Sequence, residues 1–129
     1  MAKAKIPTDI QEKVNVIIDD FNTTEFIKQP DCMYYPIYRS DYLYLYRKEG
    51  QKDGPICRLK YSGNFTDWDF AIYKYSREKY DPEESCFPGF QHVNGTIEGA
   101  LKAGLEAYPL SYSPKDSSIF SFLSNLFQR

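Results

Sequence analysis

The segment from Pro55 to Ser76, PICRLKYSGNFTDWDFAIYKYS, constrains the fold more than any other stretch of the chain. Two apolar, β-prone runs flank the pair Gly63-Asn64. A Gly-Asn pair between two such runs favours a two-residue hairpin turn, because glycine and asparagine tolerate the backbone angles that this turn requires. The sequence therefore predicts an antiparallel β-hairpin centred on this pair.

The charged and the apolar residues of this hairpin agree on one register. A two-residue turn pairs opposite charges on one face of the sheet and apolar residues on the other, and the pairs are Lys60–Asp67, Arg58–Asp69, Leu59–Trp68 and Cys57–Phe70. A slip by one residue would move every side chain to the other face and destroy both matches. This register predicts a buried face that consists of Cys57, Leu59, Tyr61, Trp68, Phe70 and Ile72.

Hydrophobic spacing predicts a helix on either side of the sheet. The N-terminal part has apolar residues at helical spacing, namely Ile10, Val14, Ile17, Ile18 and Phe21. A second helix begins after Thr96, which is a suitable N-cap, and ends before Pro109. Its buried face is predicted to contain Ile97, Leu101, Leu105 and Tyr108.

Two further β-prone segments precede the central hairpin. Residues 33–39 and 42–48 are separated by Ser40-Asp41 and are typical of a first hairpin. Pro36 cannot donate a ladder hydrogen bond, so the first of these strands is expected at a sheet edge. The sequence thus predicts an α+β fold with an N-terminal helix, an antiparallel sheet of about four strands in two hairpins, and a C-terminal helix or helices packed on one face.

The chain of 129 residues is predicted to form a single α+β domain over residues 1–109, followed by a linker and an amphipathic C-terminal helix over residues 110–129. The predicted terminal helix carries an apolar stripe, which is a candidate for self-association and consists of Ile119, Phe120, Leu123, Leu126 and Phe127. Such a stripe can pack on its own domain, on a second copy of the chain or in a partner's groove.

The composition bears on the compartment. The N-terminal residues MAKAKIPTDI lack the apolar region of a signal peptide, and no apolar run approaches the roughly 20 residues that span a bilayer. Three widely spaced cysteines fit reduced thiols better than a disulfide framework. We therefore expect a cytoplasmic protein that does not insert into membranes.

The chain contains 12 tyrosines, and several of them are predicted to share one face of the sheet. If Leu43 and Leu45 point into the core, the alternating tyrosines of the same strand point away from it. With the hairpin register, this face is predicted to contain Tyr42, Tyr44, Tyr46, Arg58, Lys60, Tyr73 and Tyr75, together with Asp67 and Asp69. Exposed aromatic patches usually mark interfaces. The first hypothesis is a non-enzymatic module that binds a protein partner or forms a homodimer.

Two other function classes remain open. A small enzyme or ligand-binding domain would place a pocket near the loop Phe87–His92, with His92 within hydrogen-bond reach of a carboxylate. Tyrosines interleaved with Arg and Lys could instead stack the bases of a single-stranded nucleic acid. The net charge of −2 and the pI of about 5.4 argue against a nucleic-acid partner. An interaction module predicts a flat, exposed tyrosine surface without a sizeable pocket.

No pattern in the chain is typical of a metal site or of a catalytic nucleophile. Cys32, Cys57, Cys86 and His92 lack the close pairs of cysteines that zinc sites usually show. Neither Cys57 nor Cys86 lies in a nucleophile motif. We therefore predict no metal, no cofactor and no catalytic residue.

Four segments give the chain a family resemblance. YRSDYLYLYRK, GPICRLKYSG, WDFAIYKYSREKYD and GTIEGALKAGLEAYP resemble uncharacterised small bacterial proteins, of a cyanobacterial type, that form a family of unknown function. The resemblance covers about Tyr34 to Pro109 and leaves out the C-terminal tail. Its motifs are turns, core aromatics and a glycine-containing helix. It implies a bacterial, cytosolic domain and brings no functional residues with it.

Overall fold

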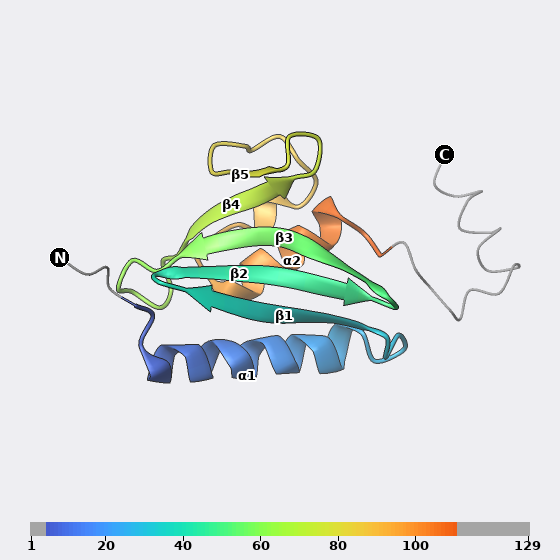
Figure 1. The fold of residues 1–129 in the computed structure, drawn as a ribbon, viewed down its shortest axis with the longest axis horizontal. Helices are drawn as coiled ribbons and strands as arrows, with labels where there is room; N and C mark the ends of the chain where they lie inside the picture. Colours follow the sequence, from blue (N-terminus) through green and yellow to red (C-terminus); the bar gives the residue numbers. More distant parts are fainter. Residues whose placement is uncertain (1–4, 111–129) are drawn as a thin grey trace, which may run out of the picture.

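The computed structural model describes residues 5–110 and has the predicted α+β architecture (Figure 1). Its elements are α1 (Thr8–Glu25), β1 (Cys32–Arg39), β2 (Tyr42–Glu49), β3 (Lys52–Lys60), β4 (Asp69–Lys74), β5 (Lys79–Asp81), a short 3-10 helix (Phe90–His92) and α2 (Ile97–Ala107). The antiparallel sheet follows the sequence order β1-β2-β3-β4-β5. The proposed C-terminal helix and its apolar stripe lie outside the described residues.

The sheet has five strands instead of the expected four. The additional strand, β5, pairs with β4 through Tyr73 and Tyr80. It contains only three residues and no alternating apolar pattern, so its sequence looks like part of the acidic loop that follows. Pairing with a neighbouring strand, and not the local sequence, makes this segment extended.

The register of the central hairpin differs from the prediction by two residues. β3 and β4 pair Lys60 with Asp69 and Leu59 with Phe70, so a loop over residues 61–68 replaces the two-residue turn. Side chains within this loop stabilise it: Ser62 Oγ donates to the Asp67 carbonyl (2.6 Å), and Asn64 Oδ1 accepts from the Thr66 amide (3.0 Å). Such local bonds compete with ladder bonds.

A displacement by two residues leaves every strand side chain on its predicted face. Cys57, Leu59 and Ile72 are buried, as predicted. Trp68 is buried as well, although it belongs to the loop and not to a strand. Tyr61 and Phe70 are half-buried.

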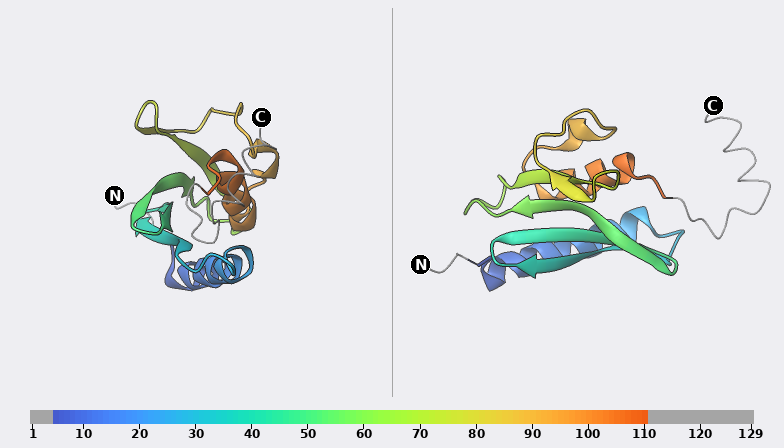
Figure 2. Two further views of the ribbon diagram at one scale, coloured as in Figure 1. Left: turned by 90° about the vertical axis from the view of Figure 1, so that its right-hand side faces the viewer. Right: turned by 45° about the horizontal axis from the view of Figure 1, so that its top comes forward.

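Both helices cover the same face of the curved sheet and form a two-layer domain (Figure 2). β2 contributes Leu43 and Leu45 to the core, and these side chains are fully buried. The helices contribute the residues that their spacing predicted, and the buried ones are Ile10, Val14, Ile18, Phe21, Ile97 and Leu101. None of the helices among residues 5–110 is long and apolar enough to cross a membrane.

Helix α1 also protects the free edge of β1. The Asn22 side chain accepts a hydrogen bond from the Tyr34 amide (2.9 Å) and donates one to the Tyr34 carbonyl (3.0 Å). One side-chain amide thereby takes the place of a neighbouring strand, which limits pairing of this edge with other chains. Pro36 lies on this edge strand, as predicted.

The buried Tyr34 joins the sheet to α2. Its hydroxyl donates to the Leu101 carbonyl over 2.8 Å, and a buried hydroxyl requires such a partner. Helix α2 can approach this closely because residue 104 is glycine: a Cβ atom there would lie 2.7 Å from the Tyr34 hydroxyl and 2.5 Å from Ile56 Cγ2. Gly104 therefore marks a close contact between α2 and the sheet.

Arg47 is the only charged residue among the buried ones in the described part of the chain. Its guanidinium pairs with Glu49 (2.8 Å), donates to the Tyr108 carbonyl, and lies over the Tyr34 ring with 5.6 Å to the centroid. The side chain thus holds the C-terminal end of α2 against β2. A buried ion pair of this kind becomes costly when one partner is removed.

We predict that Arg47→Met lowers the free energy of unfolding by about 3 kcal/mol, because it removes the guanidinium from the half-buried Glu49 carboxylate and from the Tyr108 carbonyl. Urea denaturation followed by circular dichroism measures this change. Adding Glu49→Leu to the same variant should recover part of the loss. The control is Lys48→Met on the exposed side of the same strand, which we expect within about 0.5 kcal/mol of the wild type. A loss as small for Arg47→Met would contradict the prediction.

Candidate functional site: the tyrosine face of the sheet

The sheet face opposite the helices carries six tyrosines. Alternation along β2 directs Tyr42, Tyr44 and Tyr46 away from the core, because Leu43, Leu45 and Arg47 are buried on the other side. The strand registers add Tyr35 opposite Tyr46, and Tyr73 opposite Tyr80. We call this surface the tyrosine face; it comprises Tyr35, Tyr42, Tyr44, Tyr46, Tyr73 and Tyr80, with Arg39, Arg58 and Lys60 between them.

The structure brings most of the predicted surface residues together. Tyr42 and Tyr44 have ring centroids 5.9 Å apart, and Tyr73 and Tyr80 have centroids 5.0 Å apart. Tyr75 was also predicted here, but it follows β4, donates to the Pro55 carbonyl (2.7 Å) and has its ring centroid 5.4 Å from that of Tyr108 at the end of α2. Asp67 was predicted on this face but lies in the loop over residues 61–68, because the register is displaced.

The sequence prediction missed three members of the face. Tyr35 could have been found from its place opposite Tyr46, because the first hairpin was expected. Arg39 shares that side of the same strand. Tyr80 could not be found in this way, because it belongs to β5, a strand that the sequence pattern does not predict.

The tyrosine face is not the flat, fully exposed surface that we expected. Tyr44 of β2 and Tyr80 of β5 have centroids 5.5 Å apart, although β3 and β4 separate their strands. The two rings therefore meet above the intervening strands, and Ala71 of β4 is only 2% exposed on the same side. The tyrosines of the face are half-buried among themselves.

Two arginines lie against these rings. The Arg58 guanidinium carbon is 4.7 Å from the centroid of Tyr42 and 5.2 Å from that of Tyr80. Arg39 lies over Tyr44 at 5.7 Å. Each such cation–π contact contributes about 0.5–1 kcal/mol at a partly exposed site and fixes the plane of the guanidinium.

A cleft of about 450 Å³ opens beside Arg58, between the sheet and the loop that follows β5. It is lined by Tyr42, Arg58, Lys60, Asp69, Phe70, Ala71, Pro82 and Glu83. The strands supply the floor, and Pro82 and Glu83 supply the rim.

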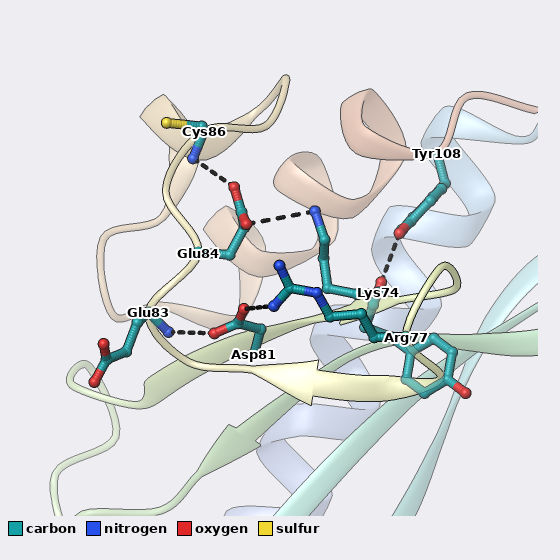
Figure 3. Close-up of polar contacts among 8 residues, drawn as sticks. Lys74, Arg77, Asp81, Glu83, Glu84, Cys86 and Tyr108 are labelled. Atoms are coloured by element: carbon teal, nitrogen blue, oxygen red, sulfur yellow. Dashed lines mark hydrogen bonds and ion pairs between the residues drawn. The ribbon is translucent and has the colours of Figure 1, made fainter.

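Hydrogen bonds and ion pairs hold the rim of this cleft in place (Figure 3). Asp81 accepts from the Glu83 amide (3.0 Å) and from Arg77 Nη1 (3.4 Å). Glu84 pairs with Lys74 over 3.4 Å. The Glu83 carboxylate points away from this network in Figure 3, so the network fixes its backbone and leaves its charge available.

A second cavity, of about 400 Å³, lies where the end of α2 meets the β2–β3 turn, and Arg47, Tyr75 and Tyr108 line it. Arg47 is occupied there by Glu49 and the Tyr108 carbonyl. Its remaining nitrogen, Nη1, is buried and has no partner among the described residues. A ligand would have to displace neighbouring side chains to reach it, so we assign Arg47 a structural role.

The alternative site at Phe87–His92 shows one of its two expected features. His92 Nε2 lies 2.8 Å from Glu106 Oε2, and this hydrogen bond lowers the pKa of the Glu106 carboxyl. The pair is exposed, however, with 30% of the His92 side chain and 49% of the Glu106 side chain accessible. Neither residue lines the two cavities above or a third one, of about 260 Å³, between α1 and α2.

The cysteines do not form a common site in the described part of the chain. Cys32 and Cys57 are buried, and Cys86 is exposed. Burial raises the pKa of the Cys57 thiol, which makes it a poor nucleophile. Within residues 5–110, no group of three or more His, Cys, Asp and Glu side chains is arranged to hold a metal ion.

No family model, curated protein or solved structure matches the chain. The functional argument therefore depends on the residues themselves, and above all on the tyrosine face and its cleft.

Environment alters the acidity of several tyrosines. Tyr35 donates a 2.6 Å hydrogen bond to Asp53 Oδ2, and this bond to a carboxylate raises the pKa of Tyr35 to about 12. Burial raises the pKa of Tyr80. Burial also raises the pKa of Tyr38, to about 12. All three phenols therefore stay neutral at physiological pH.

We predict that Asp53→Asn lowers the pKa of Tyr35 towards the value of about 10 for a free tyrosine. Its folded-state pKa lies above the unfolded one, so the bond stabilises the fold below pH ~10 and is lost as the pH rises towards 12. A titration of tyrosine ring carbons by NMR measures the change. Tyr38 serves as the internal control because burial alone raises its pKa. An unchanged Tyr35 pKa in the variant would contradict the assignment.

Proposed function

We propose that the chain is a non-enzymatic interaction module that forms a homodimer through its tyrosine face. The observation that carries this proposal is the gathering of six tyrosines on the one sheet face that neither helix covers. Tyrosine is enriched in interfaces because its ring buries apolar area while its hydroxyl remains satisfied at the rim.

The charges of the face favour a second copy of the chain as the partner. Lys60 pairs in register with Asp69 at one end of the sheet, and Lys48 pairs with Asp53 at the other. A two-fold axis brings a patch against itself, so a patch that carries both signs at each end can match its own charges. A single-sign surface would repel its copy.

The resemblance to small bacterial proteins is part of the same proposal. It places the chain in a bacterial cytoplasm, in a family whose function is not defined. A homodimer without a cofactor suits a resemblance whose motifs are turns, core aromatics and a helix with glycines. The apolar stripe Ile119, Phe120, Leu123, Leu126 and Phe127 offers a second, separate means of self-association.

We predict that light scattering on the full chain gives the mass of a dimer. Tyr44→Ala removes the central ring of the face and should weaken dimerisation roughly 10-fold or more, as interface aromatics typically do. Lys60→Glu changes only an exposed charge and should also weaken it. The matched control is Val16→Ala, a change at an exposed apolar residue of α1, on the opposite layer.

The outcomes separate the two modes of association. A dimer that persists in Tyr44→Ala but dissociates in a chain that ends at Ser113 would move self-association to the C-terminal stripe. A monomer at all concentrations would refute the homodimer. Thermal melts of each variant show whether the domain is still folded.

One observation favours a second candidate function, the binding of single-stranded nucleic acid. The displaced register removes Asp67 from the tyrosine face, so Asp69 is the one strand carboxylate beside Arg58 and Lys60 where two were predicted. Aromatic rings interleaved with cations can stack bases and contact phosphates. The negative net charge of the chain still disfavours this function.

We predict that fluorescence anisotropy detects little or no binding of a labelled oligothymidylate by the wild-type chain at physiological salt. If binding occurs, it should weaken in Tyr44→Ala and fall steeply with added salt, because released counterions drive such contacts. Saturable binding with both properties would replace self-association as the function of the face. Val16→Ala again serves as the control.

A further inference from the structure

The Arg58 side chain is fixed in orientation, yet its hydrogen-bonding groups are unused. Rings of Tyr42 and Tyr80 hold the guanidinium at 4.7 and 5.2 Å. Among residues 5–110, the Arg58 side chain takes part in no hydrogen bond and no ion pair. A cation–π contact engages the flat side of a guanidinium, whereas its N–H groups point outward in the plane. The fork of donors therefore remains available to a ligand.

These donors belong to a residue that lines the cleft of about 450 Å³, a volume within the range of small-molecule sites. Lys60 lies on the same strand and lines the same cleft. Its ammonium also has no ion-pair partner within the described part of the chain. Two cations without protein acceptors at one concave site favour an anionic ligand.

The rest of the lining specifies the kind of anion. Asp69 and Glu83 are carboxylates in the same cleft, so a dianion such as a phosphate monoester would meet repulsion that a monoanion feels less. The planar Arg fork matches the geometry of a carboxylate. Tyr42 and Pro82 supply apolar walls, which suit a flat apolar group attached to that carboxylate.

We propose that this cleft binds a small aromatic or otherwise flat carboxylate, held by Arg58 and assisted by Lys60. The ligand's carboxylate accepts two hydrogen bonds from the Arg58 fork, and its apolar body packs between the sheet and Pro82. Ala71 forms part of the floor, where a larger residue would reduce the space. This site goes beyond the proposed self-association, since its ligand is a small molecule and each protomer has a complete cleft.

Benzoate is the test ligand, and benzamide is its neutral counterpart of nearly the same shape. Titrations of the full chain, monitored by amide chemical shifts in NMR, should show saturable benzoate binding with the largest shifts at residues that line the cleft. Benzamide should bind at least about 10-fold more weakly, because it lacks the charge that Arg58 recognises. Equal binding of both compounds would overturn the proposal, and so would the absence of any saturable shift with benzoate.

Single substitutions test which residues of the cleft bind the carboxylate. Arg58→Gln should weaken benzoate binding roughly 10- to 100-fold, and Arg58→Lys should lose most of the affinity although it keeps the charge. Glu83→Gln should tighten binding, because it removes a negative charge from the rim. The matched control is Arg39→Gln, which removes an arginine that lies over Tyr44 on the same face but does not line the cleft.

Phenyl phosphate distinguishes carboxylate recognition from general anion binding. We expect it to bind more weakly than benzoate; tighter binding would overturn the assignment to carboxylates. The amide spectrum of each variant reports whether the fold is intact, and Glu83→Gln tests the site by a gain of affinity that a damaged fold cannot produce. Titrations repeated with Tyr44→Ala show whether the cleft still binds benzoate when self-association is weakened.

Discussion

The strict alternation of side chains along β2 is the constraint on which the rest of the structure depends. Leu43, Leu45 and Arg47 point to one side, while Tyr42, Tyr44 and Tyr46 point to the other. The alternation is unbroken along β2, and a shift by one residue would exchange the two sets completely. The apolar set must be covered, so both helices pack on that side, and the tyrosines remain on the side without helices. The fold and the candidate site thus both follow from the two-residue alternation of side chains along β2.

Covering the apolar side creates a second requirement, which is the satisfaction of buried polar groups. Tyr34 and Arg47 lie opposite one another in the first hairpin and both are buried. Helix α2 supplies the acceptors for both, through the carbonyls of Leu101 and Tyr108. These two bonds fix the helix along its axis, and the absence of a side chain at Gly104 permits the close approach. The polar groups in the core therefore determine where α2 lies, whereas apolar packing alone would allow it to slide.

Sequence reasoning predicted what depends on periodicity and missed what depends on loops. The helices, the first hairpin, the edge position of Pro36 and the faces of β3 and β4 follow from spacings of 2 and 3.6 residues, which dominate the energetics of burial. The turn at Gly63-Asn64 was predicted too tight, because Ser62 and Asn64 form local hydrogen bonds that replace the ladder pairing at this end of the hairpin. β5 was missed because its three residues have no strand pattern of their own. They are extended only because they pair with β4.

Both errors, the hairpin register and the missing β5, concern segments that form the candidate site. The cleft lies between β3, β4 and the loop after β5, so it exists only because the hairpin register is displaced and a fifth strand is present. Tyr80 of β5 supplies one of the two rings that hold Arg58, and the sequence alone leaves that arginine opposite Asp69 as one half of a cross-strand pair. In the structure Lys60 is opposite Asp69 and Arg58 is opposite Ala71, whose small side chain cannot accept a hydrogen bond. The displaced register thereby changes Arg58 from a residue with a partner into one whose donors face a cleft.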